Sequence, residues 1–115
     1  MKNPNRKSQL RVLRLSGSAT RGWVAFGALR WRCALGRSGS TALKREGDGA
    51  TPLGRFQLLR AYYRQDKICR PRSAIPLRPL RADDGWCDAT GDRNYNRHVR
   101  HPYRASAERM WRKDG

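Results

Sequence analysis

The chain has 115 residues, of which 26 are Lys or Arg and nine are Asp or Glu, so its formal net charge is +17. This length suits one small domain with a modest core. No stretch approaches the roughly 18 apolar residues of a membrane span, and the polar, basic start of the chain lacks the apolar run of a signal peptide.

The positive charge predicts attraction to polyanions such as nucleic acid, anionic lipid or acidic wall polymer. The alternative is that arginine, the commoner basic residue, only coats an ordinary surface, and charge alone does not decide between the two. Residues 1–9 are polar and basic, and we expect them to be disordered. Residues 10–115 are expected to form the folded part of the chain.

Three strands are predicted in the first third of the folded part. Residues 10–16 and 23–26 are the first two, and the Gly-X pair at 27–28 suits a tight hairpin turn. The sequence LRWRCALG at 29–36 has the period of two that is typical of a half-buried strand. One face of this strand would carry Leu29, Trp31, Cys33 and Leu35. Cys33 is therefore expected to be a small core residue.

Less regular structure is predicted for the rest of the chain. Residues 36–54 are too rich in glycine for a helix. Residues 55–63 resume strand character, which we favour over a short helix because the segment is aromatic and follows Pro and Gly. Three prolines within 69–81 favour extended or polyproline-like backbone that does not pair as a central strand. Residues 82–104 are predicted to be irregular, and residues 105–111 to form a helical turn. Loops of this length are usually functional or disordered, and their aromatic residues favour folding.

The sequence GDGATPLGRF at 47–56 concentrates residues with special backbone behaviour. It is not a phosphate-binding loop, because Arg55 and Phe56 follow Gly54 where that motif requires Lys and then Ser or Thr. Pro52 restricts φ in a way that suits a turn, and Gly54 can adopt positive φ. The residues themselves therefore predict a tight loop that leads into a strand.

Few residues suit catalysis or metal binding. Cys87 has acidic sequence neighbours, which disfavour a thiolate, so we expect a buried structural thiol. His98 and His101 have helical spacing, but Pro102 disfavours a helix there, so we expect two loop histidines and no zinc site. The acidic cluster of Asp83, Asp84, Asp88 and Asp92 could supply oxygen ligands for calcium. Pairing of these carboxylates with arginines is the favoured interpretation.

The three cysteines also bear on redox state. Cys33, Cys69 and Cys87 make an odd number, which argues against a closed disulfide framework. One disulfide with one free thiol remains compatible with this count.

Five short sequence motifs, in this order, resemble the YkuD-type L,D-transpeptidase catalytic domain. The resemblance extends from about Leu13 to Trp111. The motifs are CALGRSG, LKREGDGATPLGRF, DDGWCDAT, NYNR and HPYRASAERMW. The resemblance implies a mainly β fold, an incomplete YkuD-like β-sandwich with long loops. It also implies a cysteine acyltransferase that acts on peptidoglycan stem peptides in the cell envelope or periplasm, without a cofactor. In that chemistry a thiolate assisted by histidine attacks an amide and forms a thioester.

The chain departs from the family in one respect. In the family, the catalytic histidine and the Gly-Cys motif follow the last of these five motifs. Cys87 does not match the Gly-Cys motif, because it follows Trp86 and not glycine. We therefore expect the chain to be the N-terminal portion of such a domain, truncated before the catalytic residues and inactive as given. Family members build a cleft wall from the region that corresponds to residues 82–111. The cleft candidates are Trp86, Tyr95, Asn96 and Tyr103, for which packing within the loop is the alternative.

Two further expectations follow from the sequence. A YkuD-type sheet without its catalytic strands would expose an unpaired edge and an apolar face, so the chain should be poorly stable or should associate. The alternative function is that of a basic nucleic-acid-binding protein, in which aromatic side chains could stack on bases. No nucleic-acid motif is present, and the arginines are spread along the whole chain.

Overall fold

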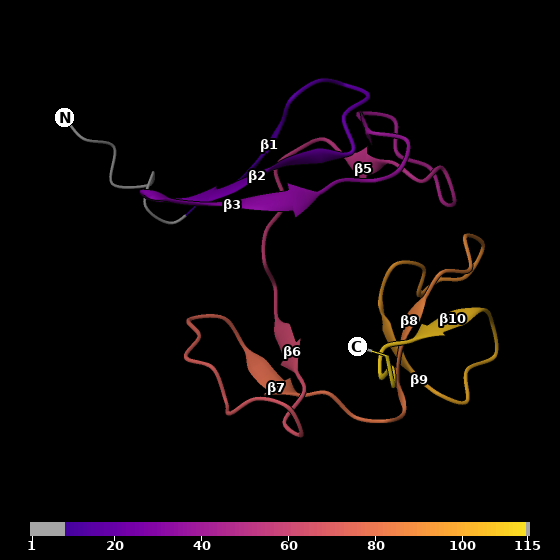
Figure 1. Cartoon of the computed structure of the whole chain (residues 1–115). Coiled ribbons are helices and arrows are strands. Elements are labelled where there is room, and N and C mark those ends of the chain that lie inside the picture. Colours follow the sequence, from indigo (N-terminus) through magenta and orange to yellow (C-terminus); the bar gives the residue numbers. More distant parts are fainter. Residues whose placement is uncertain (1–8, 115) are drawn as a thin grey trace. The chain divides into compact units, whose positions relative to one another are not determined.

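The computed structural model describes residues 9–114, so the predicted disorder of the N-terminus lies outside the described residues except for Gln9. The chain divides into two compact units, Met1–Arg55 and Phe56–Gly115, each of which is treated by itself. Residues 9–114 contain strands and no helix, which confirms the mainly β class (Figure 1). The strands are β1 (Leu10–Arg14), β2 (Arg21–Phe26), β3 (Leu29–Ala34), β4 (Ser40–Thr41), β5 (Thr51–Pro52), β6 (Ala61–Tyr63), β7 (Leu77–Pro79), β8 (Asp84–Cys87), β9 (His98–Arg100) and β10 (Ala107–Arg109).

The first unit contains the antiparallel sheet β1-β2-β3. Its three strands confirm those predicted within residues 10–36. Phe26 pairs with Leu29 across the two-residue turn, and Gly27 has a φ of 58°. Glycine adopts this conformation more readily than other residues, which explains why the Gly-X pair suits the turn of the hairpin.

The register gives this sheet two unlike faces. Leu13, Trp23 and Arg32 are directly opposite one another across the three strands, and so are Arg11, Ala25 and Arg30. The guanidinium carbon of Arg30 lies 4.3 Å from the centre of the Trp23 ring, and that of Arg32 lies 5.5 Å from it. We call this side the cationic face. The opposite side, the apolar face, carries Leu10, Val12, Val24, Phe26, Leu29, Trp31 and Cys33.

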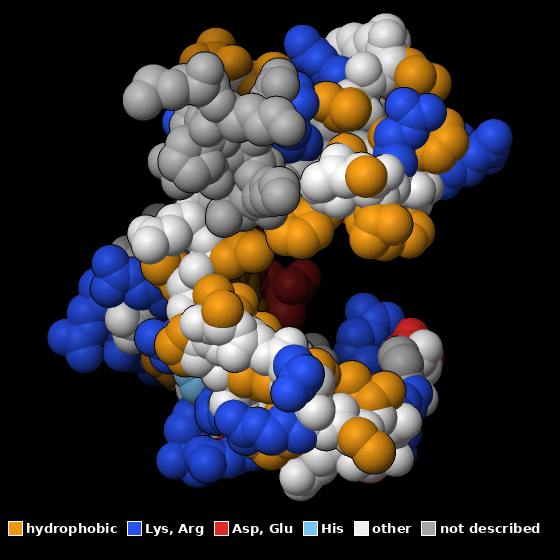
Figure 2. Space-filling model, turned by 90° about the vertical axis from the view of Figure 1, so that its left-hand side faces the viewer, with side chains coloured by type: hydrophobic (Ala, Val, Ile, Leu, Met, Phe, Trp, Pro, Cys, Tyr) orange, Lys and Arg blue, Asp and Glu red, His pale blue; other side chains and the backbone are white. Residues whose placement is uncertain are grey.

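The apolar face is not buried, although the alternation in the third strand predicts a half-buried one. Leu29 is 59% exposed and Trp31 is 50% exposed, whereas Val24 and Cys33 are half-buried. Figure 2 shows how hydrophobic side chains lie exposed among Lys and Arg side chains on the visible surface. The regular alternation therefore predicted the strand correctly, but it did not predict that the apolar face of the strand is largely exposed.

The glycine-rich segment 36–54 packs against itself. β4 and β5 pair in parallel, which adds two short strands to the predicted loop. A Cβ atom on Gly36 would lie 2.3 Å from the Gly49 carbonyl oxygen, and the Gly36 N–H donates to Thr51 Oγ1 over 2.7 Å. Gly49 has a φ of 67° and Gly54 a φ of 147°, as predicted for Gly54. The glycines thus allow close approach between two parts of the same loop.

The second unit combines a parallel pair, β6 and β7, with an antiparallel sheet of order β10-β8-β9. The central strand β8 holds the best buried residues of the described chain. Cys87 has no exposed surface, Asp84 is 1% exposed, and Val99 on β9 is 6% exposed. The core of this unit is therefore small and has a carboxylate at its centre.

Three local predictions for the second unit are wrong in whole or in part. The strand expected over 55–63 forms only at Ala61–Tyr63, and Phe56 is 67% exposed. Residues 82–104 were expected to be irregular but contain β8 and β9, and residues 105–111 contain β10 in place of a helical turn. Strands this short carry too few residues for a period of two to be visible in the sequence.

The structure also bears on the predictions for the cysteines and for membrane spans. Cys33 is half-buried, Cys69 is exposed and Cys87 is buried, and all three are free. Within residues 9–114 no helix has the length and apolar character that crossing a membrane requires.

Candidate functional site

Asp84 organises the centre of the second unit. Arg78 donates to both carboxylate oxygens, with Nη1 2.9 Å from Oδ2 and Nη2 2.7 Å from Oδ1. The Arg81 backbone N–H donates to Oδ2 over 2.7 Å, and His98 Nε2 lies 2.6 Å from Oδ1. One nearly inaccessible carboxylate therefore joins the 78–81 segment to β8 and β9.

Electrostatics follow from this geometry. Hydrogen bonds from the Arg78 guanidinium are the main reason why the pKa of Asp84 lies far below its usual range. The Arg81 N–H and the His98 ring act in the same direction, while burial opposes them. Asp84 thus remains ionised and hydrogen-bonded at neutral pH, which suits a structural anchor better than an acid-base catalyst.

Aromatic stacking extends the cluster to β6. The Tyr62 and His98 rings stack with centroids 5.7 Å apart and planes 18° apart. The Arg78 guanidinium carbon lies 4.7 Å from the Tyr62 ring centre. The Tyr62 hydroxyl is buried and has no hydrogen-bond partner within the described chain. Together, Tyr62, Arg78, Asp84 and His98 form what we call the Asp84 cluster.

A second polar cluster lies in the 92–104 segment. Tyr103 donates its hydroxyl to Asp92 Oδ1 over 2.6 Å and accepts from Asn94 Nδ2 over 2.9 Å. Arg104 Nη2 donates to Asp92 Oδ2 over 2.9 Å. The Tyr103 hydrogen bond is the main cause of the lowered pKa of Asp92, and burial is the main cause of the raised pKa of Tyr103. These contacts join the connection between β8 and β9 to the connection between β9 and β10.

Two of the four predicted cleft residues, Trp86 and Asn96, share a hydrogen bond. Trp86 Nε1 on β8 donates to Asn96 Oδ1 over 3.0 Å. Asn96 has a φ of 57°, unusual for a residue other than glycine. Tyr103 belongs instead to the second polar cluster, in which it donates a hydrogen bond to Asp92. Tyr95 is 36% exposed. The sequence therefore located a polar, aromatic region, but Trp86 and Tyr103 take part in different hydrogen-bond networks.

The acidic residues pair mainly with arginines, as predicted. Asp83 accepts from Arg100 over 2.6 Å, and Asp84 and Asp92 have the arginine partners described above. Asp88 differs, because its Oδ1 is buried without a hydrogen-bond partner in the described chain. Within residues 9–114 no group of three or more His, Cys, Asp or Glu side chains could hold a metal ion.

Within residues 9–114, neither His98 nor His101 forms a hydrogen bond with a cysteine thiol. His98 is held by Asp84, and His101 Nε2 lies 3.4 Å from the Glu108 carbonyl oxygen. The prediction of two loop histidines is therefore wrong for His98, which begins β9, and is confirmed for His101, which follows that strand. Cys87 is sealed inside the sheet, where its N–H donates to the Arg97 carbonyl and its own carbonyl accepts from Asn96. The prediction of a buried structural thiol is therefore confirmed.

Sequence reasoning missed Arg78 and Tyr62 as parts of the Asp84 cluster. Arg78 lies in a proline-rich segment that carries five basic residues and no acidic one over 67–82, so no local signal distinguished it from its neighbours. The pairing of Asp84 with an arginine was predicted, but the identity of that arginine depends on how β7 and β8 meet. Tyr62 gave no signal beyond its aromatic character.

The comparison with family models identifies the class to which this fold and these motifs belong. The model for the L,D-transpeptidase catalytic domain matches residues 5–112. The chain therefore belongs to the YkuD family. The match covers nearly the whole chain. It begins before Leu13, the residue at which the resemblance of the five motifs begins. No curated protein and no solved structure matches the chain.

Proposed function

We propose that the chain serves L,D-transpeptidase chemistry, the acyl transfer by which peptidoglycan stem peptides are joined or remodelled. The observation that carries this proposal is the family match over residues 5–112. In this chemistry a cysteine thiolate attacks a stem-peptide amide, the amine leaves, and a thioester forms that an acceptor amine or water resolves. Peptidoglycan stem peptides are accordingly the proposed partners, in the cell envelope.

We further propose that none of the three thiols in these 115 residues is the nucleophile, so that this chain alone does not catalyse the reaction. Cys87 has no exposed surface, which closes it to a peptide. Cys33 lies on the apolar face of β3, and Cys69 is exposed without a histidine in its hydrogen-bond network. A thiol needs a base or positive field and access to become an effective nucleophile. The catalytic pair is then supplied by residues other than these.

The contribution of this chain would be the wall that holds the substrate. Trp86 and Asn96 are the favoured contact residues because they share a hydrogen bond that is accessible from the surface, Trp86 being half-buried and Asn96 exposed. Tyr95, between β8 and β9, and Tyr103, between β9 and β10, are proposed as secondary contacts. Indole and amide groups suit a stem peptide, which presents amide donors and acceptors together with aliphatic side chains.

The test combines binding and chemistry on the 115-residue chain. A synthetic stem tetrapeptide should shift the backbone amide signals of residues 86 and 94–96, and Asn96→Ala should weaken this response, with Gln65→Ala, at an exposed amide side chain of the second unit, as the control. Mass spectrometry should detect no thioester with the chain or with Cys87→Ala. A thioester or exchange activity that disappears in Cys87→Ala would overturn the exclusion of Cys87.

A second candidate function is binding of nucleic acid by the cationic face, and one observation favours it. Arg11, Arg30 and Arg32 surround Trp23 on one side of the β1-β2-β3 sheet, and residues 9–45 contain no acidic side chain. Such a surface attracts phosphates with a strong dependence on salt. Single-stranded DNA binding that persists with structural or sequence preference at physiological salt would favour this function, whereas loss of all binding there would reject it.

A further inference from the structure

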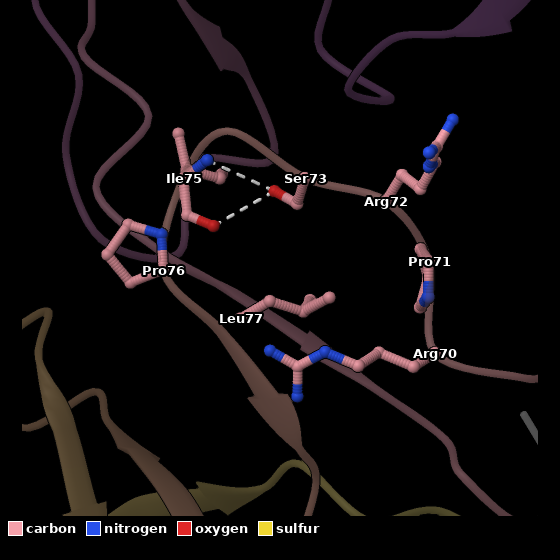
Figure 3. Close-up of a pocket in the computed structure, with 7 residues that line it drawn as sticks. All are labelled: Arg70, Pro71, Arg72, Ser73, Ile75, Pro76 and Leu77. Atoms are coloured by element: carbon pink, nitrogen blue, oxygen red, sulfur yellow. Dashed lines mark hydrogen bonds between the residues drawn. The ribbon is translucent and has the colours of Figure 1, made fainter.

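The segment from Arg70 to Leu77 encloses a hollow of about 540 Å³. It is lined by Arg70, Pro71, Arg72, Ser73, Ile75, Pro76 and Leu77. Figure 3 shows the chain bending back on itself, with the Arg70 side chain extending towards Leu77 and Arg72 projecting at the rim. The site is therefore built from one continuous segment of the second unit.

The positive charge of this bend is uncompensated. Residues 67–82 contain no Asp or Glu, and Arg78, which borders the bend, is already paired with Asp84. Arg70 and Arg72, in contrast, take part in no hydrogen bond or ion pair within residues 9–114. The two guanidiniums thus retain their full set of donors for a ligand.

The backbone adds further donors. In the described chain, the N–H groups of Arg72, Ser73 and Ala74 donate no backbone hydrogen bond. Ser73 Oγ accepts from the Ile75 N–H over 3.1 Å and lies 3.0 Å from the Ile75 carbonyl oxygen, which holds the tip of the bend in shape. Pro71 and Pro76 restrict φ on either side. The backbone of the bend is therefore restrained before any ligand binds, which lowers the entropic cost of binding.

The remaining wall is apolar. Ile75 and Leu77 are half-buried, and a smaller adjoining hollow of about 180 Å³ shares Pro76 and Leu77 and adds Arg60 and Tyr62. Guanidinium groups beside an aliphatic surface suit an anion that carries a short hydrocarbon part. A planar guanidinium can donate two parallel hydrogen bonds to a carboxylate or a phosphate.

We propose that the Arg70–Leu77 bend is an oxyanion-binding site in which the Arg70 guanidinium, which extends into the hollow, binds a carboxylate or phosphate group, while Arg72 at the rim adds positive charge. The organic part of the ligand lies against Ile75, Pro76 and Leu77. This inference does not depend on the acyl-transfer function, because it rests on the charge and shape of the bend alone.

The experiment is a titration of the 115-residue chain, followed through its backbone amide signals, with inorganic phosphate in one arm and glutarate in the other. The expected result is saturable shifts centred on residues 70–75 in at least one arm, and the arm that binds more tightly identifies the source of the oxyanion. Arg70→Gln with Arg72→Gln should weaken binding at least about tenfold, since a hydrogen bond to a charged group contributes about 1.5–3 kcal/mol.

The matched control is Arg93→Gln with Arg109→Gln, which removes the same charge from two exposed positions of the second unit. This variant should bind within about twofold of the unmodified chain if the site is local. Equal weakening in both double variants, shifts that do not saturate, or shifts spread evenly over basic residues would overturn the proposal. The map on the unmodified chain decides the matter even if a variant fails to fold.

Discussion

The two three-stranded sheets differ in what they bury. The β1-β2-β3 sheet has the longer strands and the clearer alternation, yet Leu10, Phe26, Leu29 and Trp31 on its apolar face are all more than two-fifths exposed. The β10-β8-β9 sheet has strands of three or four residues but contains Asp84, Cys87 and Val99, the buried residues that make up the core. Strand regularity and burial are therefore separate properties in this chain.

The two sheets are stabilised by different interactions. The first sheet depends on its backbone ladder and on contacts such as those between Trp23 and the flanking arginines, which are weak at exposed sites. The second sheet depends on a carboxylate whose hydrogen bonds reach three segments. Isolated small sheets are marginal in water, so loss of that carboxylate should affect the second sheet most.

The substitution Asp84→Asn should have the largest effect. It keeps the shape of the side chain but leaves the Arg78 guanidinium without its charged partner, and breaking a buried pair in this way costs about 3 kcal/mol. Amide hydrogen exchange at Gly85, Trp86 and Cys87 should accelerate strongly, whereas exchange in β2 should not change.

The matched control is Asp83→Asn, one residue away. Its partner Arg100 has a side chain that is 69% exposed, and exposed pairs contribute little. If both variants accelerated exchange in β8 equally, the buried position of Asp84 would not be what stabilises this sheet.

Acid should distinguish the same two sheets, with a smaller effect. The pKa of Asp84 is lowered in the folded chain, so its contribution is complete above the unfolded value of about 3.9 and is lost as pH falls towards the folded value. Residues 9–45, which include all of β1, β2 and β3, contain no acidic side chain. Below about pH 4, exchange should therefore accelerate in β8 before it does in β2.

Asp48 provides a local comparison within the first unit. The Lys44 ammonium, as the main cause, lowers the pKa of Asp48 to about 2, so the 44–50 loop should also loosen as pH falls through this range. Asp84→Asn should remove most of the acid dependence in β8 and leave that of the 44–50 loop unchanged. An identical acid response of β2 and β8 would contradict the assignment to Asp84.

Sequence patterns predicted the first sheet well because its information is local. Alternation over 29–36 and the Gly-X pair at 27–28 specify strand and turn within a few residues. Its exposure was not predictable from alternation, which says which residues share a face and not what covers that face. The expectation of an exposed apolar face came instead from the family resemblance.

The second sheet was missed because its information is non-local. Within 84–87 and 98–100 the side chains do not alternate for long enough to indicate strands, and what holds them is a pairing between Arg78 and Asp84 together with the ring stack of Tyr62 and His98. The sequence did indicate that the aspartates pair with arginines, and that Cys87 is structural. It could not indicate which arginine, because the chain offers so many.

The smallest expected effect concerns the apolar face, through self-association. Exposed apolar patches favour contact between copies, so the chain should form larger species as its concentration rises. Trp31→Lys places a charge on this face and should weaken association by about tenfold, equivalent to about 1.4 kcal/mol. Sedimentation velocity over a range of concentrations measures this directly.

Leu43→Lys is the control for charge, because Leu43 is 82% exposed and lies outside the sheet, in the loop between β4 and β5. If the apolar face drives association, Leu43→Lys should reduce it much less than Trp31→Lys does. A chain that stays monomeric at every concentration, with strong amide protection throughout β2 and β3, would show that this sheet is stable without any cover on its apolar face. The contrast between the two sheets would then lie in the chemistry of their stabilisation and not in its strength.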